Sequence, residues 1–466
     1  MKNAKMKIGF LPLFIKLYDD CGAGAKSRPR LEPFAKKLAG MLEERGFETV
    51  VSPFCRVKEE FAAAVKCFEK AGCEAIVTWH AAYSPSLESI DALAGTELPI
   101  IVLDTTETYD FGPCQDPGEI SYCHGIHGVM DMCSMLRRRG KKFAIAAGYV
   151  GDEVIDRVAG FVHAAVAARS MKGMKTGTVG GSFEGMGDFL VSDDEMKSRF
   201  GVEIVYPEKG ELASYAEDVK DDEIARETAA DSAAFDVLEP FGEESHARTV
   251  RYSLAVRRWI EKRGLSAFTV NFLEVRPENS LKIMPFMEAC KEMAAGVGYA
   301  GEGDVLTASL VGALMNGFAD TTFVEIFCPD WRGNTLLLSH MGEFNIRLAS
   351  GRPAMKEIPF IYGDADDPIV AYGRYRGGEG VFINLYRSAE GFKVLLSETE
   401  MVDIPDSEDK FKNKVRGWMR PRIPVARFLE ELSRHGATHH SAFVYGADAA
   451  QLGFFCDLLG LGYDVI

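Results

Sequence analysis

Two carboxylates and an imidazole occupy unusual local settings within residues 299–340. Glu302 lies in a Gly-Glu-Gly-Asp turn whose shape depends on glycine, and the amphipathic run that follows it predicts a helix N-terminus. We expect this turn to be exposed. Glu325 interrupts the apolar strand TTFVEIF, where a carboxylate facing a core costs several kcal/mol unless it is paired or binds a cation. His340 ends a second apolar strand, LLLSH.

Two hard oxygen donors and one imidazole suit Mn²⁺ or a similar divalent ion. They suit zinc less well, because no cysteine spacing accompanies them. Each residue taken alone is more often structural: a strand glutamate on a surface face, a strand-end histidine that caps a backbone group, or a GEGD helix cap. The combination of the three favours a metal site.

Other polar candidates follow predicted strands. His80 stands in the strand-end segment TWHAAYSP, where it either lines a ligand cleft or is a core histidine. His124 and His127 lie three residues apart beside glycines, a spacing that suits either metal or substrate contact. We expect His127 to contact substrate and His124 to be structural. We also assign three further histidines to structure: His163, His246 and His435.

The elements that must position these residues form a regular order. Short apolar runs alternate with helical patterns up to about residue 170, which predicts a doubly wound parallel sheet with its ligand loops at the strand C-termini. The predicted strands cover residues 8–14, 49–52, 75–78, 99–103 and 143–147.

A second α/β unit follows, with predicted strands at 176–179, 203–205 and 267–272 and a charged helical stretch over 212–235. The glycine-rich run at 180–187 lacks the GxGxxG order, so we interpret it as a loop beside the site rather than a phosphate loop. After residue 321, strands and turns predominate, and Gly377-Gly378 predicts a hairpin.

The predicted fold class is therefore α/β. Two doubly wound, Rossmann-like parallel-sheet domains are followed by a β-rich, antiparallel, barrel-like domain. We place the domains at residues 1–170, 171–320 and 321–466, because a chain of 466 residues exceeds what one hydrophobic core supports.

Composition excludes several classes of function. The net charge of −16 argues against binding nucleic acid through a broad basic surface. The ten cysteines form no CxxC pair and no disulfide framework typical of small secreted domains, so we expect reduced thiols. The apolar run near the N-terminus is too short for a signal peptide, and no later segment is apolar enough to span a membrane. We expect a soluble cytoplasmic protein.

Several motifs, in order along the chain, resemble the L-arabinose isomerase and L-fucose isomerase family, and most closely its arabinose branch. The most specific is GYAGEGD at 298–304. The others are WHAAYSP at 79–85, His127-Gly128, Ala267-Phe268-Thr269, the strand around Glu325, SHMGE at 339–343 and Thr438-His439-His440.

The resemblance implies a metal-dependent aldose–ketose isomerase. It implies that Glu302, Glu325, His340 and His440 ligate Mn²⁺, with Co²⁺ or Mg²⁺ as substitutes, and that Glu302 and Glu325 are also the acid–base pair. It further implies a monosaccharide substrate and a homo-trimer or homo-hexamer. For the substrate contacts we add His127, His80 and Tyr18.

Two departures from the family leave the sugar open. The chain is somewhat short for the arabinose branch, and its first strand runs into Leu11-Pro12-Leu13-Phe14 instead of the family's Gly-Ser-Gln sugar contact. Leu17-Tyr18 retains part of that loop. Sugar selection depends on such flanking contacts.

Aldose–ketose interconversion moves a proton between C1 and C2 through a cis-enediol, and a divalent cation stabilises the developing charge on its oxygens. One carboxylate then removes the carbon-bound proton while the other serves the hydroxyl. Two rival interpretations stay open: another metal-dependent enediolate enzyme, such as an epimerase or lyase, and a non-catalytic sugar-binding protein of the same fold.

Overall fold

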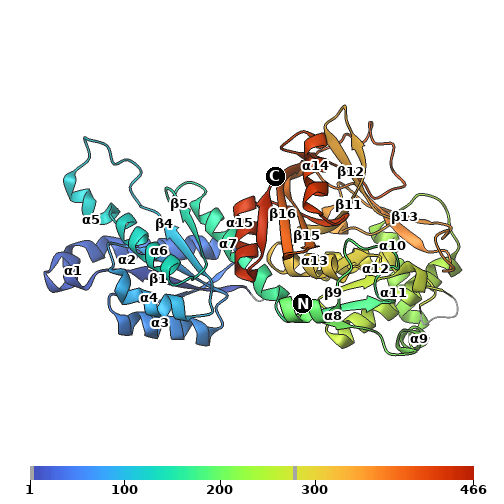
Figure 1. Cartoon of the computed structure of the whole chain (residues 1–466), viewed down its shortest axis with the longest axis horizontal. Coiled ribbons are helices and arrows are strands. Elements are labelled where there is room, and N and C mark those ends of the chain that lie inside the picture. The colour runs from blue at the N-terminus through green and yellow to red at the C-terminus, as the bar shows by residue number, and fades with distance from the viewer. Residues whose placement is uncertain (1–4, 277–280) are drawn as a thin grey trace. The chain divides into compact units, whose positions relative to one another are not determined.

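The computed structural model describes residues 5–276 and 281–466 (Figure 1). Residues 1–4, which belong to the N-terminal run and to the first predicted domain, lie outside the described residues. The chain divides into two compact units, Met1–Val166 and Ala167–Ile466, and each is described by itself. The division into three domains stays a prediction. None of the helices in the described ranges combines the length and apolarity needed to cross a bilayer.

The first unit is built on a parallel sheet of five strands in the order β2-β1-β3-β4-β5. Its strands are β1 (Lys7–Leu13), β2 (Glu48–Val51), β3 (Ala75–His80), β4 (Ile100–Asp104) and β5 (Phe143–Ala147). Its helices are α1 (Lys16–Asp20), α2 (Ala23–Glu44), α3 (Lys58–Ala71), α4 (Ser86–Gly95), α5 (Ile120–Cys123), α6 (Ile126–Arg138) and α7 (Val154–Met171), with the short η1 (Pro117–Glu119) before α5.

Helices cover both faces of this sheet. Apolar side chains of α3, α4 and α6 pack on β1, β3 and β4, with Phe61, Leu93 and Met132 fully buried. On the other face, Phe34 of α2 meets the indole of Trp79, with ring centroids 5.3 Å apart. The continuous apolar runs of β1, β3 and β4, buried between helices on both faces, thus form the predicted doubly wound sheet.

The second unit begins with a parallel sheet in the order β10-β9-β6-β7. Its strands are β6 (Lys175–Val179), β7 (Glu203–Val205), β9 (Ala267–Val270) and β10 (Gly298–Gly301). Its helices are α8 (Asp193–Phe200), α9 (Glu211–Glu217), α10 (Asp221–Ala234), α11 (Glu243–Arg263), α12 (Phe286–Ala295) and α13 (Val305–Gly317), with η2 (Phe272–Glu274) after β9. The charged stretch predicted as one helix is therefore two, α9 and α10.

A closed antiparallel barrel of six strands follows, in the order β15-β18-β11-β12-β17-β16, with β15 and β16 pairing to close it. Its strands are β11 (Thr321–Asp330), β12 (Thr335–Ser339), β15 (Gly378–Ser388), β16 (Gly391–Met401), β17 (Gly417–Pro421) and β18 (His440–Tyr445). The predicted fold class, two parallel-sheet regions and a β-rich barrel, is confirmed.

Smaller elements complete the second unit. The strand β19 (Gly462–Val465) extends β16 in parallel, and β8 (Asp236–Val237), β13 (Ala354–Glu357) and β14 (Ile369–Tyr372) form a separate sheet. The remaining helices are η3 (Ile346–Leu348), α14 (Val425–His435) and α15 (Ala449–Leu459).

Helix α13 joins the parallel sheet to the barrel. All but one of its residues are buried, because it packs on β9 and β10 on one side and on β11, β15 and β18 on the other. Close packing on β10 requires glycine, since a Cβ on Gly298 would lie 2.2 Å from the Gly312 nitrogen. This packing fixes α13 between the parallel sheet and the barrel.

The hairpin predicted at Gly377-Gly378 is wrong. Strand β15 begins at Gly378, and the turn into β16 falls at Ala389-Glu390. Gly377 instead allows a close approach, since a Cβ there would lie 2.6 Å from the Cβ of Asp403. Glycine is therefore needed at position 377 for close packing rather than for a turn.

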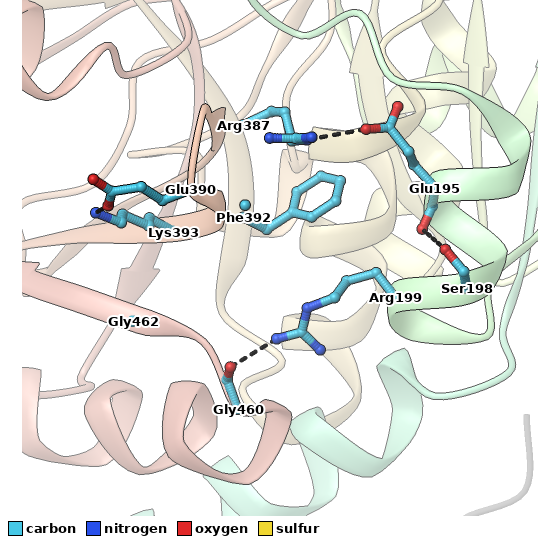
Figure 2. Close-up of a pocket in the computed structure, with 10 residues that line it drawn as sticks. Glu195, Ser198, Arg199, Arg387, Glu390, Phe392, Lys393, Gly460 and Gly462 are labelled. Atoms are coloured by element: carbon cyan, nitrogen blue, oxygen red, sulfur yellow. Dashed lines mark hydrogen bonds and ion pairs between the residues drawn. The ribbon is translucent and has the colours of Figure 1, made fainter.

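Helix α8, the β15–β16 hairpin and the end of α15 surround an open pocket of about 460 Å³ (Figure 2). Arg199 donates to the carbonyls of Leu459 and Gly460, at 2.9 and 2.8 Å, and so neutralises the C-terminus of α15. Arg387 pairs with Glu195 at 3.0 Å. These paired charges tie the sheet region to the barrel.

Candidate functional site

Glu302 sits at the end of β10, in the turn that leads into α13. Its φ of +63° lies in the left-handed region, which is uncommon for a residue other than glycine, and the following Gly303 has φ +80°. Thr269 holds the turn through its hydroxyl, which accepts from the Gly303 N–H at 3.0 Å. The Glu302 side chain is only 19% exposed, so the expectation of an exposed turn is wrong for this carboxylate.

The glycine-rich run at 180–187 contacts this turn directly. The N–H of Phe183 donates to the Glu302 carbonyl at 2.9 Å, and the Ser182 hydroxyl donates to the Gly303 carbonyl at 3.3 Å. Gly303 permits the approach, because a Cβ there would lie 2.0 Å from the Gly181 carbonyl oxygen. The interpretation of this run as a loop beside the site is confirmed.

Glu325 projects from β11, and strand register sets its neighbours. It lies opposite His440 on β18 and opposite Ser339 on β12, with His340 the next residue along the chain. Directly opposed residues of antiparallel strands point to the same face. A β-bulge at Phe327 follows Glu325, at the kind of position where bulges re-aim side chains.

Four segments thus bring the four predicted ligands together: strands β11 and β18 and the turns that follow β10 and β12. The Glu325 carboxylate lies 3.6 Å from Nε2 of His340, and the Glu302 carboxylate lies 3.7 Å from Nε2 of His440. The residues form two groups, and within each group the potential ligand atoms lie within 4.8 Å of one another. One group is Glu325, His340 and His440, and the other is Glu302, His439 and His440. The site therefore contains groups able to hold a metal ion.

In His340 and His440, the two histidines among the predicted ligands, a buried carboxylate fixes the Nδ1 atom of the ring. Nδ1 of His340 donates to Glu343 at 2.6 Å, and Nδ1 of His440 donates to Asp304 at 3.0 Å. Such carboxylate–imidazole pairs fix the tautomer and leave Nε2 free as a ligand. Nε2 of His440 is buried and has no hydrogen-bond partner among the described residues, so this donor set fits a cation.

Burial and neighbouring charges move the pKa values of the two carboxylates in opposite directions. Burial alone would raise the pKa of Glu302, but the hydrogen bond from His439 and the nearby imidazoles outweigh it and lower that pKa. Burial dominates at Glu325 and raises its pKa despite the same histidines. Two carboxylates with separated pKa values are a pattern typical of acid–base pairs.

His340 and His439 attract protons. Burial opposes the charged form of each, but Glu343 raises the pKa of His340 to about 9, while Asp188 and Glu302 raise the pKa of His439 to about 10. A cation that binds His340 must therefore displace a proton, which makes affinity rise with pH.

A cavity of about 120 Å³ opens beside Glu302 and His340. Apart from these residues and Glu343, its walls are aromatic or apolar: Phe272, Met284, Phe286, Met341, Phe360 and Tyr362. Apolar walls with a few polar groups at one end are typical of small-molecule sites.

The predicted substrate contacts lie in the first unit, at the carboxyl ends of its strands. The Tyr18 hydroxyl is 3.0 Å from Nε2 of His124, whose ring lies 5.4 Å from that of His127. His127 is exposed and stacks on Tyr83, with ring centroids 5.0 Å apart. Tyr18 and His127 thus belong to one row of rings, in which His124 is the link.

His80 lies behind this row. It is 4% exposed, neither ring nitrogen bonds to any residue in the described part of the chain, and burial lowers its pKa to about 3. Its ring packs against Gly128, where a Cβ would lie 2.6 Å from the imidazole Cδ2. A neutral, buried imidazole fits the core interpretation more closely than direct contact with a sugar, and its assignment as a contact stays a prediction.

Sequence reasoning missed three residues that hold the cluster: Asp188, Asp304 and Glu343. Asp304 also caps α13 by accepting from the Thr307 N–H at 2.8 Å. The GEGD pattern indicated only this capping role. Glu343 follows His340 by three residues, a spacing that gave a usable signal. Asp188 carries no local signal, since its partner His439 is 251 residues away.

Comparisons with known proteins agree along most of the chain. The profile of the L-arabinose isomerase central domain matches residues 191–318, and that of the L-arabinose isomerase C-terminal domain matches residues 320–462. L-arabinose isomerase 2 of Bacillus licheniformis is 26% identical over 415 residues, covering 84% of each chain. L-arabinose isomerase of Aeromonas hydrophila is 24% identical over 460 residues, covering 95% of this chain and 91% of that protein.

Proposed function

Because the chain belongs to the L-arabinose isomerase family, we propose that it interconverts an aldose and its ketose at Glu302, Glu325, His340 and His440, through a cis-enediol and with Mn²⁺. The chain is an aldose–ketose isomerase; the metal, the intermediate and the residue roles are the proposal. The single observation that carries it is the buried Nε2 of His440, which lacks a hydrogen-bond partner within the described ranges and faces two carboxylates.

In this proposal the chain's own residues divide the work. His340 and His440, oriented by Glu343 and Asp304, hold the cation together with Glu302 and Glu325. The chemistry that the cation supplies when bound is Lewis-acid stabilisation of the negative charge that develops on the substrate. One glutamate takes the proton from the substrate carbon and returns it to the neighbouring carbon, while the other serves the hydroxyl proton.

The cavity beside Glu302 is suited to orient such a substrate. Its aromatic and apolar walls contact the C–H faces of a sugar and exclude water, while the carboxylates and imidazoles at one end reach the carbons that react. We propose that His127, His80 and Tyr18 contribute to substrate binding, and that the cytoplasmic enzyme assembles as a homo-trimer or homo-hexamer.

The test is a panel of aldoses and ketoses incubated with Mn²⁺, with products identified by NMR. We expect one aldose–ketose pair to interconvert, and activity to disappear when a chelator removes the metal and to return when Mn²⁺ is restored. Co²⁺ and Mg²⁺ in place of Mn²⁺ establish which ions substitute. Full activity in a metal-free, chelator-treated sample would refute the metal dependence.

A further inference from the structure

We propose that Asp188 and His439 form a positioning pair for Glu302: Asp188 fixes the His439 imidazole, and His439 in turn sets the direction of the Glu302 carboxylate. This inference rests on the proposed function, because it assigns the pair to the proton-transfer step. Neither residue is among the four proposed metal ligands. Both lie in the second unit, Asp188 in the segment before α8 and His439 directly before β18.

Asp188 holds His439 at two points. Its Oδ2 accepts from the His439 backbone N–H at 2.8 Å and from the ring Nδ1 at 2.7 Å. One carboxylate oxygen thus fixes both the backbone position and the ring orientation of the same residue. With Nδ1–H bonded to Asp188, the remaining ring nitrogen has only one direction available.

That direction is toward Glu302. Nε2 of His439 lies 3.4 Å from the Glu302 carboxylate, closer than Nε2 of His440 at 3.7 Å. The hydrogen bonds that hold the Glu302 turn engage backbone atoms of Glu302 and Gly303, and none of them reaches the carboxylate. The bond from His439 therefore orients the carboxylate itself.

The adjacent histidines have different surroundings, which separates their roles. His440 is fully buried, bonds to Asp304 and stacks on Phe189, with ring centroids 5.3 Å apart and planes at 3°. His439 keeps 34% of its side chain exposed and bonds to Asp188 instead. Asp188 and Phe189 are neighbours, so one short segment holds His439 by hydrogen bonds and His440 by stacking.

The alternative is that Asp188 only ties its segment to the barrel. In that case its loss would loosen His440 as well, and metal affinity would fall together with turnover. A positioning role predicts that turnover falls while metal affinity stays. It also predicts that a substitution of Asp188 does not lower turnover further once His439 has been replaced.

The experiment is a double-mutant cycle with Asp188→Asn, His439→Gln and the double variant, using the aldose of the panel that turns over fastest and saturating Mn²⁺. We expect Asp188→Asn to lower kcat about tenfold, the scale of one charge-assisted hydrogen bond, with KM and the Mn²⁺ Kd changed by less than about threefold. The double variant should be no slower than His439→Gln. Asp194→Asn, at an exposed acid in the first turn of α8, is the matched control and should behave like the parent.

A second readout does not depend on turnover. In metal-free protein labelled with ¹⁵N-histidine, we expect the Nδ1-bound proton of His439 to be strongly downfield in the parent and in Asp194→Asn, and to be lost in Asp188→Asn. Losses that multiply in the double variant, an Mn²⁺ Kd that rises with the fall in kcat, or an unchanged imidazole signal would each overturn the proposal. A parent that converts no sugar refutes the proposed function, and the signal alone then decides whether Asp188 fixes His439.

Discussion

Two clusters of buried charge lie in the second unit, and they differ in how completely their members are paired. Between α10, α11 and α12, Arg257 bonds to Glu288 at 2.6 Å and to Glu227 at 2.8 Å, while Lys291 bonds to Glu227 at 2.7 Å. Each cation there meets two or more carboxylate groups at hydrogen-bond distance, since Lys291 also pairs with Asp231. Both cations of this network are therefore fully paired.

The cluster at the barrel is arranged differently. Glu325 and Glu302 face the Nε2 atoms of His340 and His440 at 3.6 and 3.7 Å, beyond hydrogen-bond length, and one of those nitrogens is the buried atom without a partner noted above. A buried charge network with full pairing contributes specificity and rigidity, whereas a partly paired one is expected to await a ligand. The two clusters should therefore respond in opposite ways to substitution.

The largest effect is expected from His440→Ala. This change removes the buried nitrogen shared by both groups of potential ligands, so Mn²⁺ binding should fall below detection in titrations followed by electron paramagnetic resonance. His439→Ala, the matched neighbour, should weaken metal binding much less because His439 is held by Asp188. Equal losses in the two variants would contradict the assignment of His440 as the ligand.

Glu302→Gln and Glu325→Gln should each lower turnover by about a hundredfold or more, the scale of general acid–base catalysis, because an amide cannot accept the transferred proton. Metal affinity should suffer less, since one oxygen donor remains. Incubation in deuterated water should label C1 of the ketose in the parent and fail to do so in the variants. If both variants exchange and turn over like the parent with metal bound, the glutamates are ligands only.

Glu288→Gln tests the paired cluster between α10, α11 and α12. This carboxylate is fully buried against Arg257, and neutralising one partner of a buried pair costs about 3 kcal/mol because the remaining charge is left undercompensated. We expect a lower melting temperature and an unchanged kcat per folded molecule. If Glu288→Gln lowers kcat and leaves the melting temperature unchanged, then this cluster serves activity rather than stability, and the contrast between the two clusters is wrong.

The local pattern of the sequence predicted much of the fold. Alternating strands and helices identified both parallel sheets, because buried strands and amphipathic helices have short periodicities. The closure of the barrel could not be predicted in the same way: β12 pairs with β17, and β15 with β18, across long stretches of chain. Gly377 shows the limit most clearly, since its reason is a contact with Asp403 rather than a turn.

The site shows the same division. Glu325 and His340 were recognisable because each is a polar residue in or at the end of an apolar strand, and Glu302 because it lies in a glycine-dependent turn before a helix. The residues that orient them were not, because Asp304 meets His440 across 136 positions and Asp188 meets His439 across 251. An acid whose partner is distant in sequence resembles an ordinary helix cap or surface residue until the chain is folded.

The smallest effect concerns one proton in the paired network. Glu292 of α12 is 8% exposed and lies 3.8 Å from Arg257, but burial and the hydrogen-bonded Glu288 together raise its pKa from 4.5 to about 8. The folded protein therefore holds a proton there that the unfolded chain releases above about pH 4.5. Stability from this group is fully present below that pH and is lost as pH rises toward 8.

Glu292→Gln imitates the protonated form and should remove this dependence. We expect its melting temperature to match that of the parent at pH 5 and to exceed it at pH 9, by the equivalent of at least about 1 kcal/mol, given 1.36 kcal/mol per pKa unit. Glu244→Gln, at an exposed acid in the first turn of α11, is the control and should follow the parent at both pH values. If the Glu292→Gln and parent curves run parallel from pH 5 to 9, then Glu292 is ionised in the folded protein, and the network tolerates an unpaired charge just as the barrel cluster does.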